Sequence, residues 1–280
     1  MDGGKPDAPD TDQSALDALF DSNARYWRDV YASDDFQGRV YRRRHERALA
    51  WVDTLDHKPR SAALEVGCGA GLLAMALAER DYSVVATDTS QVMVEQARRA
   101  VHDRNLDSKI DVRVADTHGL PWPDETFMLV VALGVVPWLH SPATGIAEMA
   151  RVTRHGGHVI LSADNSLGLS NLLEPRLSIV LAPVRRAIAG ILRALGLRAP
   201  RGLGERRYSP HRVDRMIEAA GLVREGAAGV GFGRFTFFGR RVLPERRSLA
   251  LDDRLQGLAD RSRPIIRRLG NHYLVLATKR

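Results

Sequence analysis

The sequence predicts an α/β protein in which a parallel β-sheet is covered by helices on both faces. Two observations predict this class. Between residues 59 and 165, short apolar runs alternate with segments of helical periodicity, and this order of strand and helix is typical of parallel sheets. The chain has 280 residues, 44% of them hydrophobic, which is enough to bury a large core. It contains no run of 18 apolar residues, so no membrane span is predicted.

Each element of this pattern can be placed along the chain. The predicted strands of the central region are 62–66, 83–87, 110–115, 127–132 and 157–162, and its predicted helices are 71–80, 90–103 and 142–153. Two helices are predicted before it, over 14–27 and 36–55. After it, Ser209 and Pro210 suit the start of a helix that ends near Gly221. Further strands are predicted over 229–239 and 272–278, and the second of these could close the edge of the sheet.

These elements divide the chain into five parts. We expect a disordered tail over 1–13, an N-terminal helical cap over 14–58, a core over 59–165, a helical insert over 166–207, and over 208–280 the rest of the core's domain. The tail is acidic and has no apolar centre, so it is not a secretory signal. With Cys68 as the single cysteine, no internal disulfide or cysteine-based metal site can form, no metal is predicted, and a cytoplasmic location is expected.

Charge is distributed unevenly along the chain. Residues 1–165 carry 18 Lys and Arg against 25 Asp and Glu, a balance of −7, whereas residues 166–280 carry 23 against 9, a balance of +14. Such asymmetry can indicate a surface for lipid headgroups, phosphates or nucleic acid. The alternative is that the arginines are ordinary solvated side chains, since only four of the 41 basic residues are lysine.

A glycine-rich turn follows the first predicted strand of the core. Residues 63–71 read ALEVGCGAG, with glycines at 67, 69 and 71. Glycines directly after a strand permit a tight turn and the close approach of a ligand to backbone N–H groups. The dinucleotide fingerprint would need a glycine at position 72, which is leucine, and no Gly-Lys-Ser/Thr of a P-loop follows. The turn therefore predicts a cofactor site of a different kind.

Two acidic residues follow the next two strands. Asp88 comes 21 residues after Gly67, where a carboxylate can accept both hydroxyls of a ribose. Asp116 ends the third strand, where it could meet an adenine amino group. Either residue alone could be an ordinary loop cap, but together with the glycines they line one crevice at the carboxyl ends of the strands.

With these residues in place, the chain resembles the class I S-adenosylmethionine-dependent methyltransferases. The resemblance is carried by ALEVGCGAG, VVATDTS (84–90), VADTHGLPWPDETF (114–127) and ARVTRHGGHVILS (150–162). It implies a Rossmann-like, doubly wound sheet of seven strands with the last strand antiparallel. It also implies S-adenosylmethionine as the cofactor. The residues it would place around that cofactor are Glu65, Gly67, Cys68, Gly69, Gly71, Asp88, Thr89, Met93, Asp116, Thr117, Ala132 and Leu133.

Methyl transfer mainly requires that the nucleophile be aligned with the sulfonium methyl, and a base is needed only where the nucleophile starts protonated. His140, just past the fourth strand, is the candidate base, the alternative being a loop histidine without a role. Tyr31, Trp138 and Asn165 are candidates for substrate contacts, although each could be purely structural. Cys68 is interpreted as a small residue chosen for fit and not as a catalytic thiol.

The insert suggests the class of acceptor. Residues 174–197 have one apolar helical face flanked by arginines, which suits a lid over a hydrophobic substrate, a helix on an anionic membrane surface, or a helix packed on the core. The first function predicted is methylation of an oxygen or carbon of a small, hydrophobic or amphipathic acceptor. RNA or protein methylation is an alternative, disfavoured by the absence of Asn/Asp-Pro-Pro-Tyr/Phe after the fourth strand and of an appended RNA-binding module. A non-catalytic cofactor-binding protein is the third interpretation.

Overall fold

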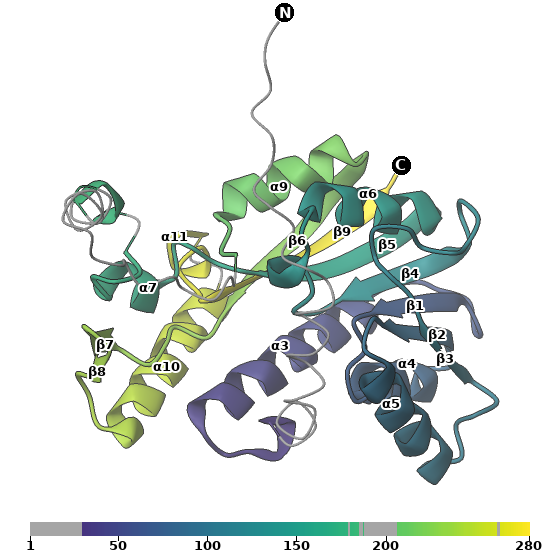
Figure 1. Ribbon diagram of the computed structural model, residues 1–280, viewed down its shortest axis with the longest axis horizontal. Coiled ribbons are helices and arrows are strands. Elements are labelled where there is room, and N and C mark those ends of the chain that lie inside the picture. Colours follow the sequence, from purple (N-terminus) through teal and green to yellow (C-terminus); the bar gives the residue numbers. More distant parts are fainter. Residues whose placement is uncertain (1–29, 179, 185–186, 188–205, 262–263) are drawn as a thin grey trace, which may run out of the picture.

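The computed structural model describes residues 30–178, 180–184, 187, 206–261 and 264–280. The strands of its main sheet are β1 (Ala62–Val66), β2 (Ser83–Asp88), β3 (Ile110–Val114), β4 (Phe127–Ala132), β5 (Thr153–Asp164), β6 (Leu222–Val230) and β9 (His272–Lys279). They are arranged in the order β3-β2-β1-β4-β5-β9-β6 (Figure 1). Strand β9 runs antiparallel to both of its neighbours, β5 and β6. The predicted seven-stranded sheet with its last strand antiparallel is confirmed.

Helices cover both faces of this sheet, as the sequence predicts. The helices of the described chain are α3 (Phe36–Val52), α4 (Leu72–Glu79), α5 (Gln91–Asp103), α6 (Pro142–Val152), α7 (Leu169–Leu173), α9 (Pro210–Ala219), α10 (Glu245–Asp260) and α11 (Pro264–Arg267), with short 3₁₀ turns η1 (Val30–Ala32) and η2 (Val136–Trp138). Apolar residues of α3, α4 and α5 pack on one face of the sheet, and those of α6 and α9 pack on the other. The sheet is therefore doubly wound.

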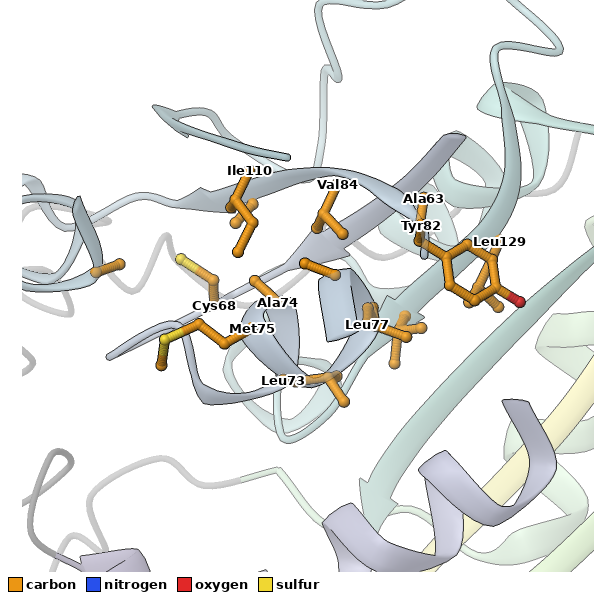
Figure 2. Packing of buried hydrophobic residues seen from close by; sticks show 14 of the residues in the cluster. Ala63, Cys68, Leu73, Ala74, Met75, Leu77, Tyr82, Val84, Ile110 and Leu129 are labelled. Carbon is orange, nitrogen blue, oxygen red and sulfur yellow. The ribbon is translucent and has the colours of Figure 1, made fainter. Parts of the chain in front are cut away.

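One of these two cores lies directly beneath the glycine turn. Figure 2 shows Leu73, Met75 and Leu77 of α4 packed with Val84 of β2 and Ile110 of β3. Strand alternation explains the arrangement, because successive residues of β1 point to opposite faces: Ala63 joins this core, whereas Leu64 and Val66 join the other. The same alternation turns Glu65 toward the face on which α4 begins. This alanine-rich core includes Cys68, so it packs directly against the glycine turn.

The C-terminal part corrects the sequence prediction in three places. The strand predicted over 229–239 is instead β6, nine residues long and ending at Val230, because pairing with β9 overrides the low strand propensity of its glycines and alanines. Residues 236–241 form a separate hairpin of β7 (Thr236–Phe237) and β8 (Arg240–Arg241). Strand β9 does not close the edge, since it lies between β5 and β6.

Helix α10, which the sequence analysis did not predict, is fixed to α3 by ion pairs. Arg43 on α3 reaches Asp252 at 2.5 Å and also pairs with Asp253, and Arg47 pairs with Asp260. Asp252 is fully buried, and it also accepts the backbone N–H of Phe232 at 2.6 Å. The carboxylates of α10 thus determine where α3 lies against the sheet. This matters because α3 supplies side chains to the site described below.

Three sequence predictions lie wholly or partly outside the described residues. They are the tail 1–13, the helix 14–27 and the helix 174–197. Of the last, the structure describes 174–178, 180–184 and 187, and it is helical there at 182–184 and 187. No described helix is long and apolar enough to cross a membrane.

Candidate functional site

The glycine turn leaves an open backbone at the carboxyl end of β1. Gly67, Gly69 and Gly71 all have positive φ, a region that other residues rarely adopt. A Cβ on Gly69 would meet nothing within 4 Å, so no atom of the described residues occupies the space beside it. A Cβ on Gly71 would lie 3.2 Å from the Cβ of Ala97, so this glycine allows α4 to begin close against α5. Gly69 thus leaves the backbone of the turn open to a ligand, whereas Gly71 allows close packing against α5.

Asp88 fixes the turn to the second strand. Its Oδ2 accepts the backbone N–H of Gly69 at 2.9 Å, and its Oδ1 accepts that of Ser90 at 3.0 Å. Ser90 in turn caps α5, where its hydroxyl accepts the N–H of Met93. The carboxylate is therefore held in one orientation at the point where β2 ends.

Glu65 is buried near the carboxyl end of strand β1, and its Oε2 has no hydrogen-bond partner in the described chain. Burial raises the pKa of Glu65 to about 8, the nearby Asp88 charge adds to the effect, and a hydrogen bond from the Ala74 backbone N–H opposes it. A buried acid with an unpaired oxygen is costly unless a positive group lies next to it. This carboxyl group is therefore suited to meeting a cation of the ligand.

Asp116 lies beyond the end of β3 and is oriented by His118. Its Oδ1 accepts both the backbone N–H of His118 (2.9 Å) and the ring Nδ1–H (2.8 Å). Burial opposes ionisation of Asp116, but these hydrogen bonds and the nearby His118 and His140 outweigh it and lower the pKa of Asp116. Asp116 is thus an ionised acceptor at the third strand end.

A single cavity joins these strand ends. Ten of the twelve predicted cofactor residues line it, namely Glu65, Gly67, Cys68, Gly69, Asp88, Thr89, Met93, Asp116, Thr117 and Leu133. Two predicted residues lie outside the lining: Ala132 is fully buried in the core, and Gly71 packs against α5. Of the predicted substrate residues, Tyr31 and Trp138 line the cavity.

Asn165 and His140 lie outside the cavity lining. The side chain of Asn165 is fully buried and donates to the backbone carbonyls of Arg268 and Gly270, at 2.7 Å each, which ties the start of β9 to the end of β5. His140 is exposed, and its ring stacks on that of His118 with the centroids 3.6 Å apart. In this position His140 is close to Asp116, at the end of the site expected to hold adenine.

Arg44 lines the cavity but was not found by the sequence analysis. It is 5% exposed, its guanidinium lies 4.7 Å from the centroid of the Tyr41 ring, and its Nη2 donates to the Tyr31 hydroxyl at 3.3 Å. Its Nε has no hydrogen-bond partner in the described chain. The sequence does contain a signal for it, since Arg44 is a charged residue between Val40 and Ala48 on the buried stripe of α3.

An Asp–His pair at the junction of β5 and β9 also lines the cavity. The Nδ1 of His272 lies 3.0 Å from Oδ1 of Asp164, and the two residues are register partners in adjacent strands. Burial disfavours the charge on Asp164, but the hydrogen bond from His272 and the nearby His272, Arg44 and Arg207 lower the pKa of Asp164. An ionised aspartate bonded to Nδ1–H leaves the other ring nitrogen, Nε2, as the basic atom.

The second imidazole in the cavity lining belongs to His45. Burial and the nearby charges of Arg44 and Arg80 lower the pKa of His45 to about 4. A group with so low a pKa is a weak proton acceptor near neutral pH. His272 is therefore the better placed base of the two histidines in the described lining.

Cys68 lines the same cavity and gives a direct test of the steric interpretation. Burial, together with the negative charges of Glu65 and Asp88, raises the pKa of the Cys68 thiol well above its usual value, so the thiol is protonated and weakly nucleophilic. Cys68→Ala is expected to keep cofactor affinity and turnover within about threefold of wild type. Alkylation of the wild-type thiol should block binding by bulk. A folded, cofactor-binding but inactive Cys68→Ala protein would contradict the prediction.

The donor set of the cavity fits the cofactor that the resemblance implies. Four carboxyl groups line it, from Glu65, Asp88, Asp116 and Asp164, against the single guanidinium of Arg44 in the described lining. S-adenosylmethionine carries a sulfonium and an ammonium against one carboxylate, so its net charge complements this set. The orphaned oxygen of Glu65 and the orphaned nitrogen of Arg44 suit an amino-acid zwitterion. The fit therefore rests on groups that lack partners within the described chain.

Comparison with known proteins agrees with this geometry. Residues 64–161, from β1 through most of β5, match the family described as methyltransferase domain. The chain is 35% identical over 147 residues to phosphatidylethanolamine N-methyltransferase of Cereibacter sphaeroides, covering 52% of this chain and 68% of that protein. It is 28% identical over 190 residues to a ubiquinone biosynthesis O-methyltransferase of Thiobacillus denitrificans, covering 67% and 75%. A structure of magnesium protoporphyrin IX methyltransferase from Synechocystis with bound SAH superposes with a TM-score of 0.63 at 15% identity, covering 96% and 100%.

Proposed function

The chain belongs to the class I S-adenosylmethionine-dependent methyltransferases, and from this premise we propose that it methylates an oxygen or carbon of a hydrophobic or amphipathic small molecule. The observation that carries the proposal is the make-up of the cavity lining, which combines two chemically different sets of residues, called here the polar half and the apolar half. One half contains the glycine turn and the carboxylates at the strand ends. The other is formed mainly by aromatic and aliphatic side chains.

The polar half would hold the cofactor. Glu65 would accept the ammonium of the methionine moiety, and Arg44 would pair with its carboxylate. Asp88 would hold the ribose hydroxyls, and Asp116 would accept the adenine amino group. When bound, S-adenosylmethionine supplies an electrophilic methyl group on its sulfonium sulfur. The chain's own contribution is to orient the reactants and exclude water, and orientation alone can supply about 7–11 kcal/mol of the barrier.

The apolar half would hold the acceptor. Its lining includes Tyr31, Val135, Pro137, Trp138 and Leu139. Side chains of this kind suit a ring system or an acyl or isoprenoid chain. Two relatives, a phosphatidylethanolamine N-methyltransferase and a ubiquinone biosynthesis O-methyltransferase, support an acceptor of this class.

The Asp164–His272 pair would supply the base. A hydroxyl, phenol or carbon acid loses a proton as it is methylated, and the Nε2 of His272 is proposed to accept that proton while Asp164 holds the ring and stabilises its positive charge. Of the two, His272 would be the catalytic residue and Asp164 the positioning residue. His140 is the second candidate for the base.

A second candidate function is methylation of a lipid amine, favoured by the relative that is a phosphatidylethanolamine N-methyltransferase. RNA methylation is disfavoured, because the carboxylates of Asp88, Asp116 and Asp164 line the described cavity against one guanidinium and would repel a phosphate backbone. A non-catalytic cofactor-binding protein is distinguished by binding without turnover.

The proposal is tested by methyl transfer from labelled S-adenosylmethionine to a matched set of acceptors. The set contains a catechol bearing an isoprenoid tail, the same catechol without the tail, phosphatidylethanolamine in detergent micelles, and total RNA. We expect the tailed catechol to be methylated and to exceed the tailless one by about tenfold or more in kcat/KM, because several methylene groups enter the apolar half. Labelling of RNA alone, or cofactor binding with no turnover on any acceptor, would contradict the proposal.

A further inference from the structure

A hairpin far from the cofactor half breaks a local rule of chain conformation. The two residues that connect β7 to β8, Phe238 and Gly239, both have positive φ, at 48° and 77°. Two-residue hairpin loops of this type prefer Asn, Asp or Gly at the first position, and a bulky aromatic residue there is unfavourable. Phe238 gains little from packing in return, because its side chain is 61% exposed. An unfavourable backbone conformation without compensating packing indicates that the Phe238 side chain makes a contact outside the folded chain.

The hairpin is part of a larger exposed apolar surface. Phe237 is 55% exposed and packs edge-on against the Phe238 ring, 5.0 Å away between centroids. Further exposed apolar residues lie at the end of α7, in the segment that follows it, and next to β8. They are Leu173, Leu177, Val180, Leu181, Val184 and Val242. We call the hairpin and these residues the apolar face.

A hydrogen bond joins the two parts of the apolar face. The buried carboxylate of Glu174 accepts the backbone N–H of Gly239 at 2.8 Å, and the guanidinium of Arg176 lies against the same glycine. Figure 1 shows α7 beside β7 and β8, at one end of the molecule. The hairpin and the residues around Glu174 are therefore held next to each other.

Arginines flank the hairpin of the apolar face in the sequence. The stretch from 234 to 247, RFTFFGRRVLPERR, contains five arginines and one acidic residue, Glu245. Of these, Arg240, Arg241, Arg246 and Arg247 are exposed. Exposed aromatic side chains with arginines beside them in the chain suit the interface of an anionic bilayer. There, aromatic rings lie at headgroup depth and cations pair with lipid phosphates.

The apolar face is anchored beside the acceptor half of the cavity. Helix α7 follows β5, whose last residue is Asp164. The Ser170 hydroxyl of α7 donates at 2.8 Å to Asn271, the residue before His272. Helix α7, which carries Leu173 of the apolar face, is thus bonded to the residue next to His272.

We propose that the apolar face docks the protein on an anionic lipid bilayer, with Phe237 and Phe238 inserted at the headgroup level. The arginines pair with lipid phosphates, and the strained Phe238 is retained for this contact. The proposal does not depend on which acceptor is methylated.

The test is co-sedimentation of the full chain with vesicles of phosphatidylcholine, alone or mixed with phosphatidylglycerol. We expect binding to the mixed vesicles that weakens as salt is added. Arg240→Ala with Arg241→Ala should lower the partition coefficient about 30-fold, since each arginine near an anionic surface contributes about fivefold. Phe237→Ser should lower it about tenfold or more, because an apolar ring no longer leaves water.

Two variants serve as controls for these effects. Arg104→Ala with Arg113→Ala removes two arginines that are each 58% exposed, the same as Arg241, and should leave vesicle binding unchanged. Phe238→Asn separates docking from folding. Because Asn tolerates positive φ, this variant should melt at a higher temperature than wild type and yet bind vesicles more weakly.

Three results would overturn the proposal. They are equal binding to neutral and mixed vesicles, hairpin variants that bind like the wild type, and a solution dimer that the Phe237→Ser variant converts to monomer. The last result would assign the apolar face to a contact between copies of the chain. Cofactor affinity, measured in parallel, should be the same in all variants, so a failure of docking is distinguishable from a failure of the methyltransferase site.

Discussion

Asp88→Ala is expected to weaken S-adenosylmethionine binding by about 100-fold or more. The carboxylate is proposed to accept both ribose hydroxyls, and each hydrogen bond to a charged group contributes about 1.5–3 kcal/mol. It also accepts the backbone N–H of Gly69, so its loss releases the turn that faces the cofactor. Both effects act in the same direction. Isothermal titration calorimetry measures the change directly.

The controls for Asp88→Ala separate lost contacts from lost folding. Asp111→Ala removes a carboxylate from the neighbouring strand β3 that pairs with Arg113 on the surface, and it should leave affinity within about twofold. Asp88→Asn keeps the shape but can no longer accept as a full charge, so its affinity should fall between those of alanine and wild type. NADH should not bind any of the proteins measurably. A folded Asp88→Ala protein that binds S-adenosylmethionine like wild type would remove Asp88 from the ribose site.

The half of the site around Asp88 could be predicted because its signals are contiguous in sequence. The glycine turn, Asp88 and Asp116 each follow directly on an apolar strand, and parallel strands bring their carboxyl ends to one edge of the sheet. The first five strands were predicted for the same reason, since their runs of Val, Leu and Ile favour strand without help from distant contacts.

The other half of the site depends on pairing between distant segments. Asp164 and His272 are 108 residues apart and meet only because β9 is inserted antiparallel between β5 and β6. Strand β6 was missed for a related reason, because the sequence LVREGAAGV has little strand propensity of its own and is fixed by its partner. Arg44 stands in a run of three arginines, and only the burial of one face of α3 distinguishes it from Arg42 and Arg43.

The same long-range pairing leads to the second large prediction, which concerns the base. His272→Gln is expected to lower kcat by about 10²–10⁴-fold, the usual contribution of a positioned general base. The measurement is methyl transfer to the best acceptor found in the screen above. S-adenosylmethionine affinity should stay within about threefold, because His272 is not among the residues proposed to hold the cofactor. A fall in kcat with unchanged cofactor binding is not expected of a residue that only supports the fold.

The dependence of activity on pH tests the role of the Asp164–His272 pair more closely. A histidine base must be neutral to accept a proton, so kcat/KM of the wild type should fall at acid pH, and the His272→Gln protein should lose this limb. Asp164→Asn should keep the ring in the cavity but remove the charge that stabilises its protonated form, and should lower kcat while shifting the limb. An acid limb that disappears instead in His140→Gln would transfer the role to that residue. His140 lies outside the cavity lining and is stacked on His118, so we expect His140→Gln to retain activity within about threefold.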